Sequence, residues 1–154
     1  MAYWLLKTEP SSFSIDDLAR APGKRSAWDG VRNYQARNFL RDEMKVGDEA
    51  FLYHSSCEVP GIAGIVKIVR AGYPDPTAFE RGHHHYDPES DPAAPRWFMV
   101  DVKLERKLKR IVTLEELRAH AAGKLRDLQL LKRGNRLSVL PVSAPSWRFI
   151  RSLE

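Results

Sequence analysis

The segment from Arg96 to Leu108 constrains the fold most, because its apolar and charged residues alternate. A period of two places successive side chains on opposite faces, so this segment predicts a long strand with one buried face. Phe98, Val100, Val102 and Leu104 fall on the buried face. Four other segments have the composition of strands, namely Tyr3–Thr8, Glu49–Ser55, Ile62–Ala71 and Leu137–Val142. In the third of these, Ile62, Val66 and Ile68 are predicted to share a face.

Short helices are predicted between these strands. A long helix is expected from Val31 to Met44, whereas Tyr73–Pro95 has several prolines and few aliphatic residues and predicts a loop. Three helix starts carry a capping residue, namely Ser14, Thr113 and Ser143. The order of elements lacks the βαβ alternation of a doubly wound sheet. We therefore expect an α+β fold, in which short helices decorate a bent, mostly antiparallel β-barrel, within a single domain spanning residues 1–154.

Composition limits the classes of function. The formal charge of +5 and a pI near 9.5 favour an anionic partner. The single cysteine, Cys57, excludes an internal disulfide and fits a reducing compartment. No apolar run is long enough to span a bilayer, and the first residues lack the pattern of a signal peptide. We expect a cytoplasmic or nuclear protein without a membrane partner.

The segment from Trp28 to Asn38 is the clearest candidate binding motif. It combines a large ring in Trp28, an amide in Asn33 and the guanidinium groups of Arg32 and Arg37. A ring stacks on a nucleobase, an amide binds base edges and arginines bind phosphates. The alternative is a core tryptophan beside a solvated helix face. Taken alone, the arginines are better explained as a solvated helix face. The whole cluster, in a basic chain, is better explained as a binding site for a nucleobase and its phosphates.

Two other segments offer polar groups for a binding site. Alternation places Tyr53 and Ser55 together at a strand end, where rings and hydroxyls form a pocket wall. The turn Lys132–Ser138 combines basic residues with Gly134, whose missing side chain lets a phosphate or base approach the backbone. The alternatives are an apolar core face at the strand end and a solvated basic surface at the turn.

Patterns typical of enzymes and metal sites are weak. Cys57 and His54 are three residues apart at a strand end, where a nucleophile and its base rarely align. The run His83–His85, followed by Asp87, is the one candidate metal cluster, but neighbouring histidines splay apart and structural zinc sites draw on spaced ligands. We interpret it as a surface loop that binds adventitious metal. No catalytic residue, metal or cofactor is predicted.

Six segments form an ordered set of motifs, namely Tyr3–Pro10, Trp28–Asn38, Tyr53–Ser55, Pro60–Gly64, Pro95–Val102 and Leu130–Ser138. Together, from Tyr3 to about Ile150, the chain resembles the EVE domain of the thymocyte nuclear protein family and its small bacterial relatives. The resemblance implies a PUA-like fold related to the YTH readers of methylated adenine. It also implies a pocket for a modified base, with methylated or hydroxymethylated cytosine in DNA as the leading ligand class.

The resemblance to YTH domains also assigns positions in the pocket. Lys7, Thr8 and Glu9 would edge it, and Trp28 would form one aromatic wall. The second wall stays open among four rings, those of Tyr53, Tyr73, Tyr86 and Trp97. Together with the motifs above, the predicted base pocket comprises Lys7, Thr8, Glu9, Trp28, Asn33, Tyr53, Ser55, Trp97 and Ser138. The predicted phosphate contacts are Arg32, Arg37, Lys132, Arg133 and Arg136.

The expected function is non-catalytic binding of one extruded or single-stranded modified base, with DNA preferred to RNA as the partner. Other classes stay open at this point. They are an RNA-binding accessory of RNA modification, a sensor of a free modified nucleoside or metabolite, and a hydrolase of a modified base using Glu9 or His54. Any action that follows recognition would need a separate effector protein.

Overall fold

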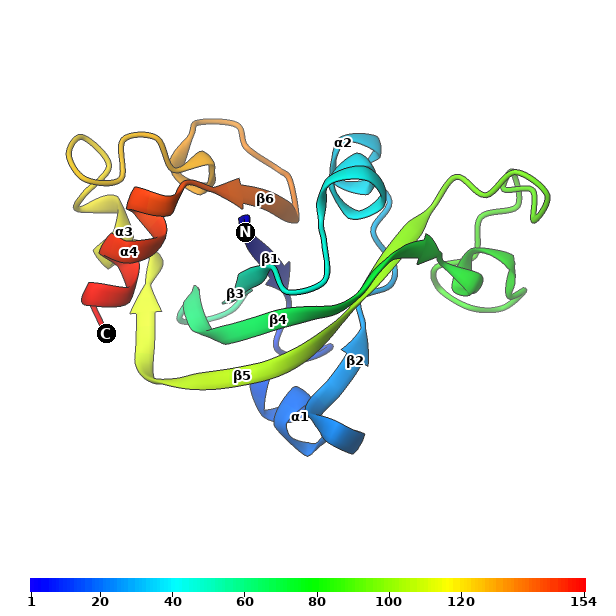
Figure 1. Ribbon diagram of the computed structural model, residues 1–154, viewed down its shortest axis with the longest axis horizontal. Helices are drawn as coiled ribbons and strands as arrows, with labels where there is room; N and C mark the ends of the chain where they lie inside the picture. The colour runs from blue at the N-terminus through cyan, green and yellow to red at the C-terminus, as the bar shows by residue number, and fades with distance from the viewer.

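A six-stranded mixed sheet forms the centre of the computed structural model, which describes residues 1–154 (Figure 1). The strand order is β2-β5-β4-β3-β1-β6, and only β1 and β3 pair in parallel. Because β2 and β6 are the unpaired edges, the sheet is bent but not closed into a barrel. The strands are β1 (Tyr3–Thr8), β2 (Arg25–Ala27), β3 (Glu49–His54), β4 (Gly61–Pro74), β5 (Phe98–Thr113) and β6 (Val139–Val142).

The helices are short, and three begin at the predicted capping residues. The side chains of Ser14, Thr113 and Ser143 each accept a hydrogen bond from a backbone N–H in the first turn. No helix is long and apolar enough to cross a membrane. The α-helices are α1 (Ile15–Arg20), α2 (Tyr34–Asn38), α3 (Leu114–Arg118) and α4 (Ala144–Ser152). The shorter helical segments are η1 (Pro22–Lys24), the π-helical η2 (Phe39–Glu43), η3 (Pro76–Phe79) and η4 (Gln129–Leu131).

One correction concerns the helix expected from Val31. The helix α2 begins at Tyr34, because Asn33 has extended backbone angles and its side chain accepts a hydrogen bond from the Ala36 N–H. The residues from Trp28 to Asn33 therefore form an extended segment that leads from β2 into α2. This segment can reach the opposite edge of the sheet, which a helix of the same length could not.

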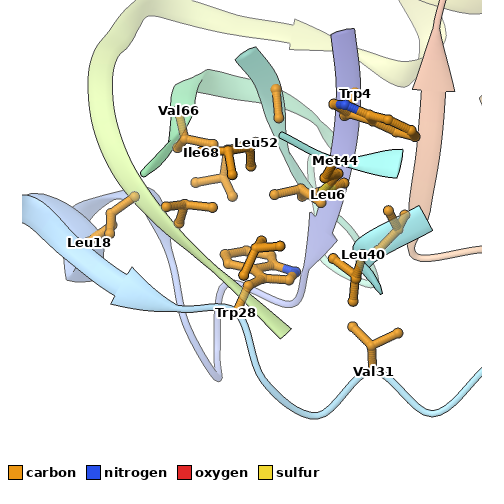
Figure 2. Close-up of a cluster of buried hydrophobic side chains, with 14 of the residues drawn as sticks. Trp4, Leu6, Leu18, Trp28, Val31, Leu40, Met44, Leu52, Val66 and Ile68 are labelled. Carbon is orange, nitrogen blue, oxygen red and sulfur yellow. The ribbon is translucent and has the colours of Figure 1, made fainter. Parts of the chain in front are cut away.

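Each face of the sheet carries its own hydrophobic core. The first core contains Trp4, Leu6 and Trp28 and is covered by α1, α2 and η2; Figure 2 shows the Trp28 ring among its apolar neighbours. The second core contains Phe51 and Trp147, whose rings stack with centroids 3.9 Å apart, and is covered by α3 and α4. Alternation along β1 and β3 explains the division, because successive residues enter opposite cores.

Register shifts bend β4 and β5 and change which face their residues share. The pairing of the two strands shifts between Ile62 and Gly64 and again between Ile65 and Val66. Val66 and Ile68 therefore pack in the first core, whereas Ile62 packs in the second, contrary to the simple alternation expected from the sequence. The bend turns the two unpaired edges of the sheet toward the same cavity.

Candidate nucleic-acid interface

A cavity of about 560 Å³, here called the main cavity, lies between the unpaired edges of the sheet. Two backbone hydrogen bonds extend the strands into its walls. The Lys7 N–H donates to the Ser138 carbonyl at 2.9 Å, and the Trp28 N–H donates to the Val100 carbonyl at 2.7 Å. Its lining comprises Lys7, Thr8, Ser12, Phe13, Ser26, Ala27, Trp28, Asp29, Gly30, Val31, Arg32, His83, His84, His85 and Ser138.

Trp28 belongs to both the core and the cavity wall. Its residue surface is only 7% exposed, and its ring meets the Phe13 ring edge to face with centroids 6.4 Å apart. Figure 2 shows the indole directed into the apolar cluster, with Val31 on the side away from Val66. Only a small part of the ring is therefore available to a ligand. The indole anchors the cavity wall as well as lining it.

Lys7 is the cation that the protein leaves free inside the main cavity. Its side chain is half-buried and forms no hydrogen bond or ion pair with the protein. Burial lowers the pKa of this ammonium group, because removal from water disfavours the charged form. By contrast, the neighbouring Thr8 hydroxyl donates to the Phe13 carbonyl at 2.7 Å and holds the wall in place. Lys7 is thus available to an anion or a hydrogen-bond acceptor.

Arg32 is held by protein groups rather than left free for phosphate. Its guanidinium donates to the Asp75 carboxylate at 3.0 Å and to the His85 carbonyl at 2.8 Å, and it lies over the Trp97 ring at 5.4 Å. Asp75 is fully buried and also accepts hydrogen bonds from the Gly30 N–H and from Thr77. This network joins the extended segment to η3 and to the run His83–His85.

The ionisation of Asp75 follows from that network. Burial by itself would raise the pKa of this carboxyl. Hydrogen bonds from Thr77, Gly30 and Arg32 outweigh burial, so the net pKa lies below the ordinary value. Asp75 is therefore a carboxylate at neutral pH, and its charge is balanced by Arg32.

The run His83–His85, here called the histidine loop, forms one wall of the main cavity. The His85 N–H donates to Nδ1 of His83 at 3.0 Å, and the His85 carbonyl accepts from Arg32. The rings of His83 and His84 stack with centroids 4.7 Å apart, and the His85 ring is tilted against that of His84 at 3.9 Å. Sequence reasoning considered these residues only as metal ligands and missed this wall. The signal that was present is a run of rings in a loop otherwise poor in apolar residues.

A second cavity of about 360 Å³, here called the basic cavity, adjoins the main one. The two share a boundary at consecutive residues, since Arg32 and Ser138 line the first while Asn33 and Leu137 line the second. Arg133 and Arg136 are exposed and form no ion pair, whereas Lys132 donates to the Arg126 carbonyl. The lining comprises Asn33, Gln35, Gln129, Lys132, Arg133, Gly134, Asn135, Arg136 and Leu137.

Several predicted site residues lie outside the main cavity, which corrects their expected placement. Tyr53 is 3% exposed and packs in the second core, because β3 directs it to the opposite face of the sheet from Leu52. Trp97 stacks on Tyr34 and donates from its indole to Asp87. Glu9 is exposed beyond the rim, as the chain leaves β1.

Three other predicted residues have structural roles. Ser55 lies next to Thr8 through a backbone hydrogen bond but does not line the cavity. Asn33 caps α2 and faces the basic cavity instead of the main one. Arg37 donates to the Arg96 carbonyl at 2.7 Å and is held there. The structure thus brings together Lys7, Thr8, Trp28, Arg32 and Ser138 in the main cavity, and Lys132, Arg133 and Arg136 in the basic one.

Comparison with known proteins identifies the family. The family model described as EVE domain matches residues 2–153. This chain belongs to the EVE domain family. Among its relatives is thymocyte nuclear protein 1 of mouse, 51% identical over 167 residues that cover 99% of this chain and 73% of the mouse protein. The family assignment agrees with the resemblance drawn from the sequence motifs.

Solved structures similar to this chain share its fold over 99% of its length. The crystal structure of human THYN1 protein in complex with 5-methylcytosine containing DNA matches with a TM-score of 0.94 and 48% identity, covering 99% of this chain and 97% of that one. A Pseudomonas syringae protein matches with a TM-score of 0.93 and 49% identity, covering 99% of both chains. The α+β, PUA-like fold class expected from the sequence is confirmed, with the sheet open at its edges.

Proposed function

We propose that this EVE domain protein is a reader of methylated cytosine in DNA, and that the modified base enters the main cavity. The observation that carries the proposal is the match over 99% of the chain to human THYN1, which was crystallised with 5-methylcytosine containing DNA. The cavity volume of about 560 Å³ supports it. Pockets that bind small ligands measure roughly 300–1,000 Å³, so a single pyrimidine nucleotide fits.

The lining supports binding of a base rather than of a bare anion. Trp28, Phe13 and Val31 supply an apolar wall on which a ring and its methyl group pack. Lys7 and Ser138 supply a cation and a hydroxyl from the opposite edge of the sheet. Extrusion of a base from a duplex costs a few kcal/mol, whereas stacking on a fully available ring is worth about 1–3 kcal/mol. Because Trp28 is only 7% exposed, stacking on it offsets just part of this cost. Polar contacts must therefore supply the surplus.

The basic cavity supports contact with the adjoining DNA backbone. Arg133 and Arg136 are exposed, have no carboxylate partner and lie directly beside the main cavity. A nucleotide in the main cavity would bring its own or a neighbouring phosphate to this surface. Each phosphate that these arginines neutralise releases counterions, so binding is expected to weaken with salt. Arg32 and Arg37, which are held by carbonyl groups, support the walls instead.

We further propose that recognition is not coupled to catalysis. In the main cavity His85 lies 4.0 Å from Asp29, an arrangement that could orient a general base. A catalytic arrangement also needs a nucleophile within hydrogen-bond reach of that base. The hydroxyl near His85 is that of Thr77, and its proton is donated to Asp75 at 2.6 Å. The histidine therefore has a structural neighbour where an enzyme would place a nucleophile.

Fluorescence polarisation with matched duplexes tests the proposal. One duplex carries a single 5-methylcytosine and the other carries cytosine at the same position. We expect tighter binding of the methylated duplex by the wild-type protein, and weaker binding after Lys7→Met, which removes the free cation of the main cavity. Lys45→Met is the matched control, since Lys45 is exposed and lines neither cavity.

The outcomes separate the competing functions. Equal affinity for both duplexes, unchanged by Lys7→Met, would contradict a base reader and leave a basic surface. Preference for RNA of the same sequence would favour an accessory of RNA modification. Equally tight binding of free 5-methyldeoxycytidine, with no effect of salt, would favour a nucleoside sensor, because the phosphate contacts would then contribute nothing. Trp28→Ala is a poor test, since loss of a buried tryptophan costs about 3–5 kcal/mol of stability.

A further inference from the structure

We propose that Nε2 of His85 accepts a hydrogen bond from the exocyclic amino group of the bound cytosine, and so distinguishes methylated cytosine from thymine. This inference deepens the proposed function and rests on it. Thymine carries the same ring methyl group as 5-methylcytosine but has a carbonyl oxygen in place of the amino group. A methyl-binding wall alone cannot separate the two bases. A hydrogen-bond acceptor that faces the exocyclic amino group separates them.

The backbone of His85 is fixed on both sides. Its N–H donates to Nδ1 of His83 at 3.0 Å, and its carbonyl oxygen accepts from Nη2 of Arg32 at 2.8 Å. Arg32 is in turn held by the buried carboxylate of Asp75. The imidazole of His85 is therefore held in a defined place at the cavity wall, although it is part of a long loop. Such support is what a group that reads a base edge requires.

The surrounding hydrogen bonds determine which ring nitrogen carries the proton. A threonine hydroxyl has a single proton, and that of Thr77 is donated to Oδ1 of Asp75 at 2.6 Å. Toward Nδ1 of His85, at 3.4 Å, the Thr77 oxygen can therefore only accept. The other neighbour of Nδ1 is a carboxylate oxygen of Asp29 at 4.0 Å, which is also an acceptor. Both neighbours thus favour a proton on Nδ1.

In the neutral ring, a proton on Nδ1 leaves Nε2 as an acceptor. Burial is the main cause that lowers the pKa of His85, which favours this neutral form. No protein group donates to Nε2, and the side chain, which lines the main cavity, is 21% exposed. Asp29, the other two histidines of the loop and Arg32 are the charged or titratable groups that face the ring. The cavity therefore holds an unsatisfied acceptor.

The packing of His85 on Gly30 leaves that acceptor open. A Cβ built on Gly30 would lie 2.4 Å from both Cε1 and Nε2 and 2.9 Å from Cδ2. Such similar short distances to three ring atoms place Gly30 over the face of the imidazole, not at its edge. The lone pair of Nε2 lies in the ring plane, so the glycine does not cover it. An amino group in the cavity can therefore approach Nε2 along the ring plane.

The test compares ligands and protein variants together. Duplexes carry 5-methylcytosine, thymine or 5-methyl-2-pyrimidinone opposite an abasic site, so that none of the three bases is paired. The last base lacks the amino group. We expect the wild-type protein to bind 5-methylcytosine about 3- to 10-fold more tightly than 5-methyl-2-pyrimidinone, the range of one hydrogen bond. His85→Phe keeps a ring but removes Nε2, and it should abolish that difference and the preference over thymine.

His120→Phe is the matched control, because His120 lines neither cavity and its ring lies beside that of Phe149; it should keep the discrimination. Retention of the full discrimination by a folded His85→Phe protein would overturn the inference. If the His85→Phe protein fails to fold, the affinities of the wild-type protein test the inference. Equal affinity for 5-methylcytosine and 5-methyl-2-pyrimidinone would then overturn the inference. Failure of the proposed function gives a different result, namely no wild-type preference for 5-methylcytosine over cytosine.

Discussion

Removal of the Asp75 carboxylate is expected to destabilise the protein by about 3 kcal/mol. Removing one partner of a buried ion pair costs about 3–5 kcal/mol, because the other charge is left unbalanced. Asp75 is fully buried, and its loss also leaves the Gly30 N–H and Thr77 without their acceptor. Arg32 is 24% exposed and keeps its bond to the His85 carbonyl, so the cost lies at the lower end of that range.

Thermal unfolding followed by circular dichroism measures this cost. For a domain of this length, 1 kcal/mol shifts Tm by about 2–4 °C, so Asp75→Ala should lower Tm by about 6–12 °C. Asp75→Asn should have a smaller effect, because each oxygen of Asp75 accepts two hydrogen bonds and the amide oxygen keeps the two of the position it occupies. Asp42→Ala removes an exposed partner of Arg41 and should change Tm little. A Tm for Asp75→Ala within about 2 °C of wild type would refute the reasoning that this network holds the cavity wall.

Three further outcomes are expected. A hydrogen bond with Glu105 and burial raise the pKa of Glu49 from its ordinary 4.5 to about 7. The protonated form of Glu49 therefore stabilises the folded protein. This stabilisation is complete below about pH 4.5 and is lost as the pH rises through about 7. Glu49→Gln should therefore raise Tm relative to wild type at about pH 8 but not at about pH 5, and an equal rise at both values would contradict this. Arg133→Ala combined with Arg136→Ala should lower the slope of log affinity against log salt by about 2 for DNA, measured by polarisation; an unchanged slope would exclude phosphate contacts there. Gly30→Ala should cost about 1–3 kcal/mol in urea unfolding, because φ is +80° and the added Cβ meets an imidazole; a neutral effect would be inconsistent with that packing.

Local sequence patterns predicted the elements well where the determining interactions are local. The alternation from Phe98 to Leu104 indicated a strand, and Val100 and Val102 are fully buried on its inner face. The capping residues also fixed helix starts. The face of Ile62 could not be predicted, because the register shifts that move it to the second core arise from pairing between β4 and β5. Such pairing depends on residues far apart in the sequence.

The site could be predicted only in part, because its arrangement also depends on contacts between residues far apart in the sequence. The motifs containing Trp28 and Ser138 were chosen from residue types, and Lys7 came from the resemblance to YTH domains. The bent sheet brings these three residues to one cavity. Sequence alone could not show that Arg32 is held by Asp75, which is 43 residues away, because a guanidinium that binds phosphate and one that supports a wall have the same local pattern. Nor could it place the histidine loop beside Gly30, since that contact depends on the same network.

The most direct test of base entry into the main cavity is an NMR titration that follows the indole N–H signals of the four tryptophans. Trp28 lines the cavity, whereas Trp147 is buried in the core on the other face of the sheet. Addition of duplex DNA with one 5-methylcytosine should shift the Trp28 signal strongly and leave the Trp147 signal in place. The unmethylated duplex should shift Trp28 less. Shifts confined to exposed basic residues, with the Trp28 signal unmoved by either duplex, would contradict binding of the base in this cavity.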